Sequence, residues 1–201
     1  MDLASNESKN KKAAQKKISY RQGQVYTMRG VGGIFSKGMN RLEDTLEDDY
    51  HIRTASTIWY KAKPLSDFII KNYKSKELQG PIILIGHSLG ANEQIKVARN
   101  LEREHIPVAL LMTIDAVSPV TVPPNVKHAF NIYKPGIVPM FSGLALKAMD
   151  PEFTHIDNFN VTRLHGVYVN HFTIDKNNNI QKIMLNKVLA TLKESTKKQI
   201  S

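Results

Sequence analysis

The segment Pro81–Gly90 restricts the fold of this chain more than any other. Pro81–Ile85 (PIILI) is an uninterrupted apolar run, which is typical of a parallel strand covered by helices on both faces. Gly86–Gly90 (GHSLG) predicts a tight turn, and Ala91–Glu104 has the apolar spacing of an amphipathic helix. A strand, a turn and a helix in this order are the repeating unit of an α/β sheet with parallel strands.

The rest of the chain repeats this alternation of strands and helices. We expect strands where apolar and β-branched residues cluster, and helices where apolar residues recur every three or four positions. The expected strands are Gln24–Arg29, His51–Ile58, Val108–Ile114, Lys127–Tyr133 and Asn160–Val169, and the expected helices are Ser36–Asp49, Leu65–Tyr73 and Ile180–Lys193. Pro135–Phe159 is poorly periodic and predicts loops with at most a short helix. Right-handed crossovers then give a three-layer α/β/α sandwich with a mostly parallel sheet.

Length and charge indicate one domain with basic ends. A chain of 201 residues, 41% of them apolar, can bury one sizeable core. Residues 1–22 are rich in lysine and predict a disordered tail, residues 23–195 form the expected domain, and residues 196–201 form a short C-terminal tail. The tail has no aromatic residue before Tyr20, so we expect no nucleic-acid partner in spite of the net charge of +10. A weak contact with an anionic surface is the alternative.

Several classes of protein are excluded or disfavoured by composition. Cysteine is absent, which excludes disulfides and cysteine-ligated metal sites. No apolar stretch approaches the ~18 residues of a membrane span, and residues 1–20 lack the apolar core of a secretory signal. A cytoplasmic location is therefore the default expectation, and export with a removed leader stays compatible with the sequence. The oligomeric state is not predicted.

The turn after the apolar strand carries the sharpest chemical signal. Gly86-His87-Ser88-Leu89-Gly90 fits the pattern G-x-S-x-G, in which a strained turn between a strand and a helix exposes a nucleophilic serine. The predicted strand and helix on either side supply the structural setting that this pattern requires. Ser88 is therefore the candidate nucleophile, and an ordinary turn serine is the alternative interpretation.

With this motif the chain resembles the α/β-hydrolase superfamily, in particular its small lipase- and thioesterase-like members. The residues that carry the resemblance are Ile83–Asn92 (ILIGHSLGAN), Arg29–Met39 (RGVGGIFSKGM), Thr113–Pro119 (TIDAVSP) and Asn170–Asp175 (NHFTID). It spans most of residues 24–192, with the serine turn as its specific motif. The resemblance implies a serine esterase or thioesterase that acts on a small acyl substrate without a cofactor.

A serine hydroxyl needs a general base, for which the chain offers seven histidines. His171 follows the last expected strand and precedes the last helix, the position from which this superfamily supplies its base. His165 is the alternative. His87 lies inside the serine turn and is assigned to packing or to support of the site.

The third partner must be a carboxylate that orients the imidazole. Asp115 ends the most apolar strand, where an unpaired charge would be costly to bury. The order Ser88, Asp115, His171 agrees with that of the superfamily. Most members place the acid one strand later, so Asp150 and Asp157 are the alternatives, and a capping role is the non-catalytic interpretation of Asp115.

Acyl transfer also needs donors for the developing oxyanion. The resemblance assigns one to the backbone N–H of Leu89 and the other to the glycine loop after the first expected strand, where Gly32, Gly33 and Ile34 are the candidates. The loop lacks the spacing of a dinucleotide fingerprint. No metal site is predicted, because histidines next to aspartates, such as His155 near Asp157, are interpreted as surface pairs.

The predicted activity is hydrolysis of a carboxylic ester or thioester through an acyl-enzyme. Pro135–Phe159 is apolar and is interpreted as an acyl-binding wall or short lid, with an ordinary connection as the alternative. An acyltransferase that uses the same three residues, a catalytically inactive binding protein with this fold, and an adaptor that uses the basic tail are the competing functions.

Overall fold

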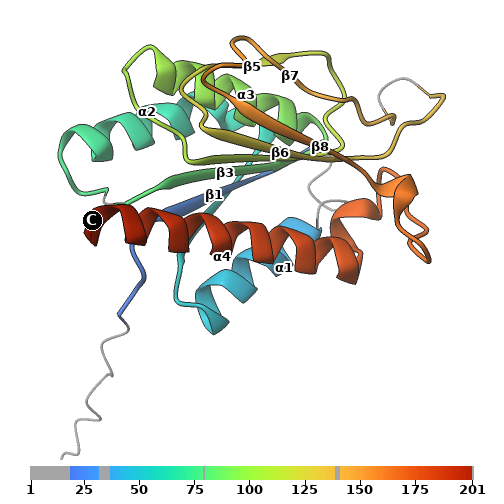
Figure 1. Ribbon diagram of the computed structural model, residues 1–201, viewed down its shortest axis with the longest axis horizontal. Helices are drawn as coiled ribbons and strands as arrows, with labels where there is room; N and C mark the ends of the chain where they lie inside the picture. Colours follow the sequence, from blue (N-terminus) through green and yellow to red (C-terminus); the bar gives the residue numbers. More distant parts are fainter. Residues whose placement is uncertain (1–18, 32–36, 79, 139–140, 201) are drawn as a thin grey trace, which may run out of the picture.

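Six parallel strands form the central sheet of the computed structural model, which describes residues 19–31, 37–78, 80–138 and 141–200 (Figure 1). Their order in the sheet is β2-β1-β3-β4-β6-β8, and every neighbouring pair is parallel. The strands are β1 (Gln24–Arg29), β2 (Arg53–Ile58), β3 (Ile82–His87), β4 (Leu110–Ile114), β6 (His128–Tyr133) and β8 (His155–Asn160). Two short strands, β5 (Thr121–Val122) and β7 (Lys147–Ala148), pair separately.

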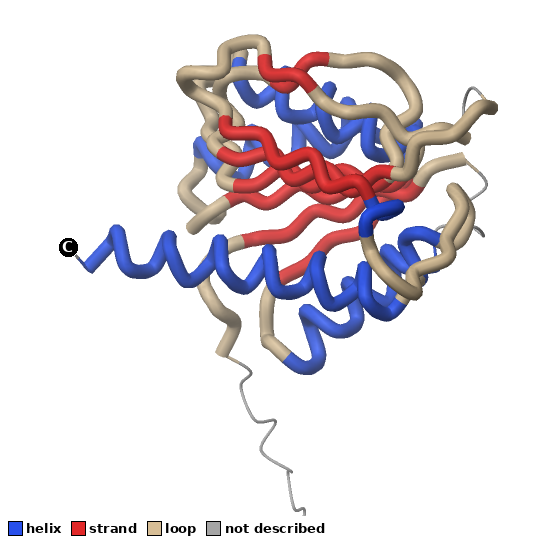
Figure 2. Tube along the Cα trace, turned by 45° about the vertical axis from the view of Figure 1, so that its right-hand side comes forward, coloured by secondary structure: helices blue, strands red, loops and turns tan. Residues whose placement is uncertain are grey.

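Helices cover both faces of this sheet (Figures 1 and 2). On one face lie α1 (Lys37–Asp44), which continues into a π-helical turn at Thr45–Asp49, and α4 (Asn178–Ile200). On the other face lie α2 (Ala62–Lys74) and α3 (Leu89–Glu102). The sequence-based prediction of a three-layer α/β/α sandwich with a mostly parallel sheet is therefore confirmed.

The central strands explain the uninterrupted apolar run. All six residues of β3 are buried, and its four apolar residues, Ile82–Ile85, alternate between two hydrophobic clusters. Ile82 and Leu84 pack with α2 and α3, whereas Ile83 and Ile85 pack with α1 and α4. A strand that is covered on both faces needs apolar residues at every position, because successive side chains point to opposite faces.

The prediction of the last strand is wrong. Asn160–Val169 does not form a strand: it begins with a single 3₁₀ turn at Val161–Arg163, and Gly166 adopts a left-handed φ of 72°. The sixth strand is instead β8, of which all but the last residue, Asn160, belong to the Pro135–Phe159 segment expected to form loops. Because β8 is an edge strand, its polar residues are exposed or half-buried, and its sequence HIDNFN therefore lacks the apolar pattern of the inner strands.

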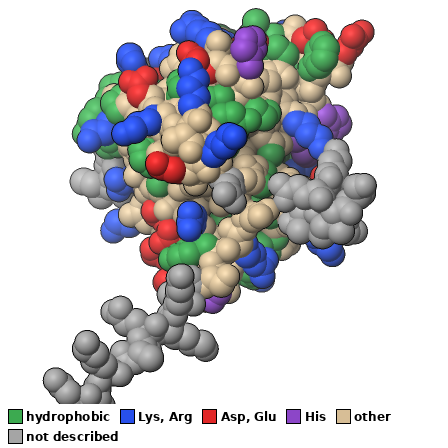
Figure 3. All heavy atoms as spheres, turned by 90° about the vertical axis from the view of Figure 1, so that its left-hand side faces the viewer, with side chains coloured by type: hydrophobic (Ala, Val, Ile, Leu, Met, Phe, Trp, Pro, Cys, Tyr) green, Lys and Arg blue, Asp and Glu red, His purple; other side chains and the backbone are tan. Residues whose placement is uncertain are grey.

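The two expected tails are only partly described by the structure. Residues 1–18 of the expected N-terminal tail lie outside the described residues. At the other end α4 continues to Ile200, through positions 196–200 that the sequence assigned to a tail. On the face shown in Figure 3, Lys and Arg side chains are interspersed with acidic and apolar ones. None of the helices in the described part of the chain combines the length and apolarity that crossing a lipid bilayer requires.

Candidate active site

Ser88 lies at the sharp turn between β3 and α3. Its backbone has φ 59° and ψ −128°, a strained combination for a residue with a side chain. The turn is tightly packed, because a Cβ atom at Gly86 would lie 2.4 Å from the carbonyl oxygen of Gly90, and one at Gly90 would lie 2.3 Å from that of Met28. The two glycines of the motif are thus required by the close approach of backbone to backbone, which places Ser88 at the carboxyl edge of the sheet.

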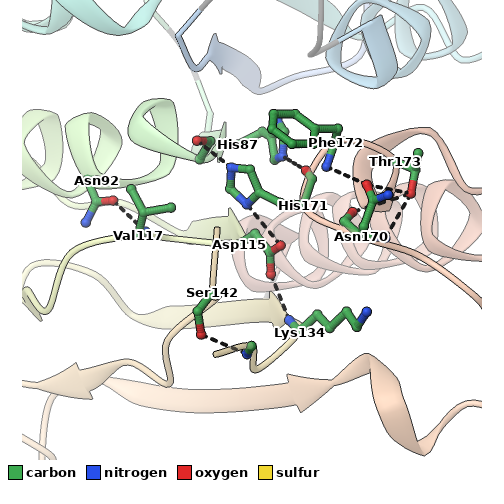
Figure 4. Close-up of polar contacts among 12 residues, drawn as sticks. His87, Asn92, Asp115, Val117, Lys134, Ser142, Asn170, His171, Phe172 and Thr173 are labelled. Atoms are coloured by element: carbon green, nitrogen blue, oxygen red, sulfur yellow. Dashed lines mark hydrogen bonds and ion pairs between the residues drawn. The ribbon is translucent and has the colours of Figure 1, made fainter. Parts of the chain in front are cut away.

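His171 contacts both Ser88 and Asp115. Its Nε2 atom lies 2.8 Å from the Ser88 Oγ atom. Its Nδ1 atom lies 3.2 Å from the Asp115 Oδ2 atom (Figure 4). Because a carboxylate can only accept, the Nδ1 atom carries the proton, and the Nε2 lone pair faces the serine hydroxyl. The structure therefore brings together the three side chains that the sequence selected from three distant segments.

The Asp115 carboxylate is fixed on both sides. The residue is fully buried and adopts a left-handed φ of 49° at the end of β4. Its second oxygen, Oδ1, accepts a hydrogen bond of 2.7 Å from the backbone N–H of Lys134 (Figure 4). Gly143 packs against it so closely that a Cβ atom there would lie 2.2 Å from Oδ1. Hydrogen bonds to both oxygens offset the free-energy cost of burying this carboxylate, and they restrict its movement.

The alternative acids and the alternative base have other surroundings. The Asp157 carboxylate accepts hydrogen bonds from His128 and His155, on β6 and β8. The Asp150 carboxylate accepts one from the backbone N–H of Glu152 in its own turn. His165 is exposed. Asp115, which directly follows β4, is the one of these three carboxylates whose contact with His171 is seen in the structure.

A short hydrogen-bonded loop positions His171. The Asn170 Oδ1 atom accepts from the backbone N–H of Phe172, and the Asn170 N–H donates to the Thr173 Oγ1 atom, each at 2.9 Å (Figure 4). The His171 side chain itself is only 5% exposed. The residues on either side of the imidazole thus hold its backbone in one conformation.

His87 supports the same loop from inside the serine turn. Its Nε2 atom lies 2.9 Å from the carbonyl oxygen of His171, so that nitrogen carries a proton and donates it. Burial lowers the pKa of His87 to about 4, which keeps the ring neutral at physiological pH. The supporting role that the sequence assigned to His87 has this contact as its physical basis.

The expected oxyanion donors are only partly described. Leu89 is the first residue of α3, at the end where helical N–H groups lack partners within the helix. Gly32, Gly33 and Ile34 lie outside the described residues. Gly30, at the start of the same loop, is so close to Ser88 that a Cβ atom there would lie 2.8 Å from the Ser88 Cβ atom. The glycine loop therefore leaves β1 directly beside Ser88.

A small cavity of about 240 Å³ opens beside His171. Two aromatic rings form much of its wall: the centroids of the Phe141 and Phe172 rings lie 5.6 Å and 5.5 Å from that of the His171 ring. The cavity is lined by Lys134, Pro135, Gly136, Val138, Phe141, Asn170, His171 and Phe172. Part of the apolar segment after Pro135 thus borders the site.

No protein-family model and no curated protein matches the sequence. Solved structures do match. The product of the lin2722 gene of Listeria innocua is 11% identical, with a TM-score of 0.51 over 81% of this chain and 92% of its own. Human thioesterase 2 is 12% identical, with a TM-score of 0.49 over 87% and 97% of the two chains. The RedJ thioesterase of prodiginine biosynthesis in Streptomyces coelicolor is also 12% identical, with a TM-score of 0.47 over 85% and 86%.

At such low identities the likeness concerns the fold alone. The six-stranded parallel sheet, with its serine turn between β3 and α3, is the arrangement that the sequence predicted. The chain has an α/β-hydrolase fold.

Sequence reasoning missed Asn92 as a supporting residue of the candidate site. Its Oδ1 atom accepts from the backbone N–H of Val117 at 2.9 Å, and its Nδ2 atom donates to the carbonyl oxygen of Ser118 at 2.8 Å. Asn92 thereby ties the first turn of α3 to the loop that follows Asp115 (Figure 4). The available signal is an amide one helical turn after Ser88, because a polar group on a buried helix face needs partners.

Asp175, four positions after His171, is a buried carboxylate that sequence reasoning also missed. Its Oδ2 atom accepts a hydrogen bond of 3.0 Å from the backbone N–H of Gly38, at the start of α1. Its Oδ1 atom has no hydrogen-bond partner among the residues that the structure describes. Burial raises the pKa of Asp175 to about 6.

We therefore expect the protein to lose stability relative to Asp175→Asn as the pH rises. Because the folded pKa exceeds the unfolded value of 3.8, the folded state binds the proton more tightly, and this contribution is present below pH 3.8 and lost through about pH 6. The difference between these two pKa values corresponds to a change on the order of 2–3 kcal/mol in the free energy of unfolding relative to Asp175→Asn. Urea unfolding of both proteins across this range measures it.

The control for this prediction is Asp48→Asn, which neutralises an exposed carboxylate. The difference between the control and the native protein should stay nearly constant over the same pH range. A difference between the native protein and Asp175→Asn that does not change with pH would contradict the prediction.

Proposed function

We propose that this chain is a serine hydrolase that cleaves a carboxylic ester or thioester through an acyl-enzyme on Ser88. One observation carries the proposal: the His171 imidazole bridges the Ser88 hydroxyl and the buried Asp115 carboxylate, with distances of 2.8 Å and 3.2 Å. This geometry allows proton transfer from a hydroxyl to a base that is held in the correct tautomer.

In the first half of the proposed reaction, the Ser88 Oγ atom attacks the carbonyl carbon of the substrate while its proton moves to the His171 Nε2 atom. The negative charge of Asp115 stabilises the imidazolium that forms. The tetrahedral intermediate then collapses, the C–O or C–S bond breaks, and the leaving alcohol or thiol takes the proton from Nε2. The acyl group stays on Ser88 as an ester.

In the second half, water replaces the leaving group. His171 accepts a proton from this water as its oxygen attacks the acyl carbon, and then returns the proton to the Ser88 Oγ atom as the acid departs. The backbone N–H of Leu89 is the first proposed donor to the oxyanion in both halves, and Gly33 or Ile34 supplies the second.

The cavity beside His171 supports an acyl group of modest size. Its volume of about 240 Å³ lies below the usual range of drug-sized ligand pockets, which begins at roughly 300 Å³. Phe141 and Phe172 present aromatic surface beside the His171 ring, and the proposal places the acyl chain against them. We therefore propose a short or medium acyl chain in preference to a bulky triglyceride.

A fluorophosphonate probe tests the proposal, since it forms a stable adduct only with an activated serine. We expect stoichiometric labelling of the folded protein, with the adduct mapped by mass spectrometry to the peptide that contains Ser88. Ser118→Ala is a matched control, because Ser118 contributes backbone groups to the site and alanine keeps them. This variant should be labelled like the native protein.

Turnover is then measured with p-nitrophenyl esters and acyl thioesters of increasing chain length. Release of the free acid identifies hydrolysis, whereas transfer to an added alcohol identifies an acyltransferase. A folded protein that is not labelled, or an adduct on a different serine, would refute the proposed function.

A further inference from the structure

Three potential metal ligands meet near the amino-terminal ends of β6 and β8, at the opposite end of the strands from the candidate active site. His128 and His155 are the first residues of β6 and β8 and are paired in register, whereas Ser88 and Asp115 follow the carboxyl ends of their strands. Asp157 lies two residues after His155 and therefore points to the same face of the sheet. We refer to His128, His155 and Asp157 as the His–Asp cluster.

The ligand atoms of the His–Asp cluster converge. The Nε2 atom of His128 lies 2.8 Å from the Asp157 Oδ2 atom, and that of His155 lies 3.0 Å from the Oδ1 atom. One ligand atom from each residue can be chosen so that all lie within 4.8 Å of one another. Two imidazoles thus share one carboxylate through hydrogen bonds. A cation bound between the three side chains would replace the protons of these hydrogen bonds.

We propose that the His–Asp cluster binds a divalent transition-metal ion of the zinc type, separate from the proposed hydrolytic site. Two imidazole nitrogens and a carboxylate are ligands that zinc prefers, and metal–ligand distances of about 2.0–2.1 Å place neighbouring ligand atoms roughly 3.3 Å apart in a tetrahedron. The two nitrogen–oxygen separations, 2.8 Å and 3.0 Å, are shorter than this, and the chosen ligand atoms all lie within 4.8 Å of one another, so side-chain adjustments of about an ångström or more would bring them to a common ion. The ion would link the edge strand β8 to β6.

The charges around the His–Asp cluster affect its affinity for a cation. A metal ion binds an imidazole nitrogen that carries no proton, so the Nε2 proton that His128 shares with Asp157 must leave that nitrogen on binding. Lys187 of α4 opposes binding, because its Nζ atom lies 3.2 Å from the Asp157 Oδ2 atom. The same ammonium group lies 4.7 Å from the centroid of the Phe130 ring, which offers it a second partner when a cation binds.

Zinc titration of the full, untagged chain at neutral pH tests the proposal. We expect one equivalent of Zn²⁺ to bind with a dissociation constant of about 10 μM or lower, and Co²⁺ to give the absorption of a four-coordinate site. His155→Ala and Asp157→Asn should each weaken zinc binding at least about tenfold. His155 is 71% exposed, so its replacement is not expected to unfold the protein.

His165→Ala is the matched control, because it removes an exposed histidine outside the cluster. It should bind zinc like the native protein, and zinc should raise the melting temperature of the native protein and of this control but not that of His155→Ala. Absence of binding up to about 100 μM Zn²⁺, or equal affinity in the native protein and His155→Ala, would overturn the proposal.

Discussion

Ser88→Ala will lower kcat for ester or thioester hydrolysis by about five to six orders of magnitude. Alanine lacks the oxygen that forms the acyl-enzyme, and the His171 base then has no hydroxyl to deprotonate. The backbone conformation at position 88 is as strained for alanine as for serine, so stability should change little. Steady-state kinetics with the best substrate of the acyl series, together with loss of fluorophosphonate labelling, measure the effect.

Ser118→Ala again serves as the control for Ser88→Ala, and it should keep kcat within about twofold of the native value. Retention of more than about 1% of native kcat by folded Ser88→Ala protein would mean that another group is the nucleophile. A substrate affinity that survives in the variant would show that its binding site is intact.

Asp115→Asn will lower kcat by about four orders of magnitude while the protein stays folded. The asparagine oxygen can still accept the hydrogen bond from the Lys134 N–H, but its NH₂ group then faces the His171 Nδ1 atom as a donor. The imidazole is therefore driven into the tautomer whose Nε2 atom carries the proton. That nitrogen can no longer accept a proton from Ser88.

The matched control for Asp115→Asn is Asp150→Asn, which alters a carboxylate at the position where many members of the superfamily carry the acid. Asparagine keeps an acceptor for the Glu152 N–H, and kcat should stay within about twofold of native. If Asp150→Asn lost activity and Asp115→Asn did not, the assignment of the acid would be reversed.

The parts of the fold that could be predicted from sequence are those that depend on residue types and spacing within a short segment. The apolar run of β3 reveals a strand covered on both faces, because every position there contacts a helix. The glycines around Ser88 reveal a turn in which backbone atoms approach too closely for a Cβ atom. The edge strand β8 could not be predicted in this way, since its half-exposed polar residues lack an apolar period.

The candidate site shows the same division between local and long-range information. Ser88 was selected by its motif and His171 by its place after the last expected strand, although Asn160–Val169 does not form that strand and the sixth strand is β8. The choice of Asp115 over Asp150 and Asp157 depends on which carboxylate the fold carries to the imidazole. Chain order alone allows all three.

The sequence by itself determined the layered α/β architecture and the serine turn, because both follow from the spacing of apolar residues and glycines along short segments. Only the tertiary structure decided which carboxylate contacts His171, that His87 and Asn92 support the loops around the site, and that His128 meets His155. These contacts join residues far apart in the chain. They are set by strand order and register, which short segments do not encode.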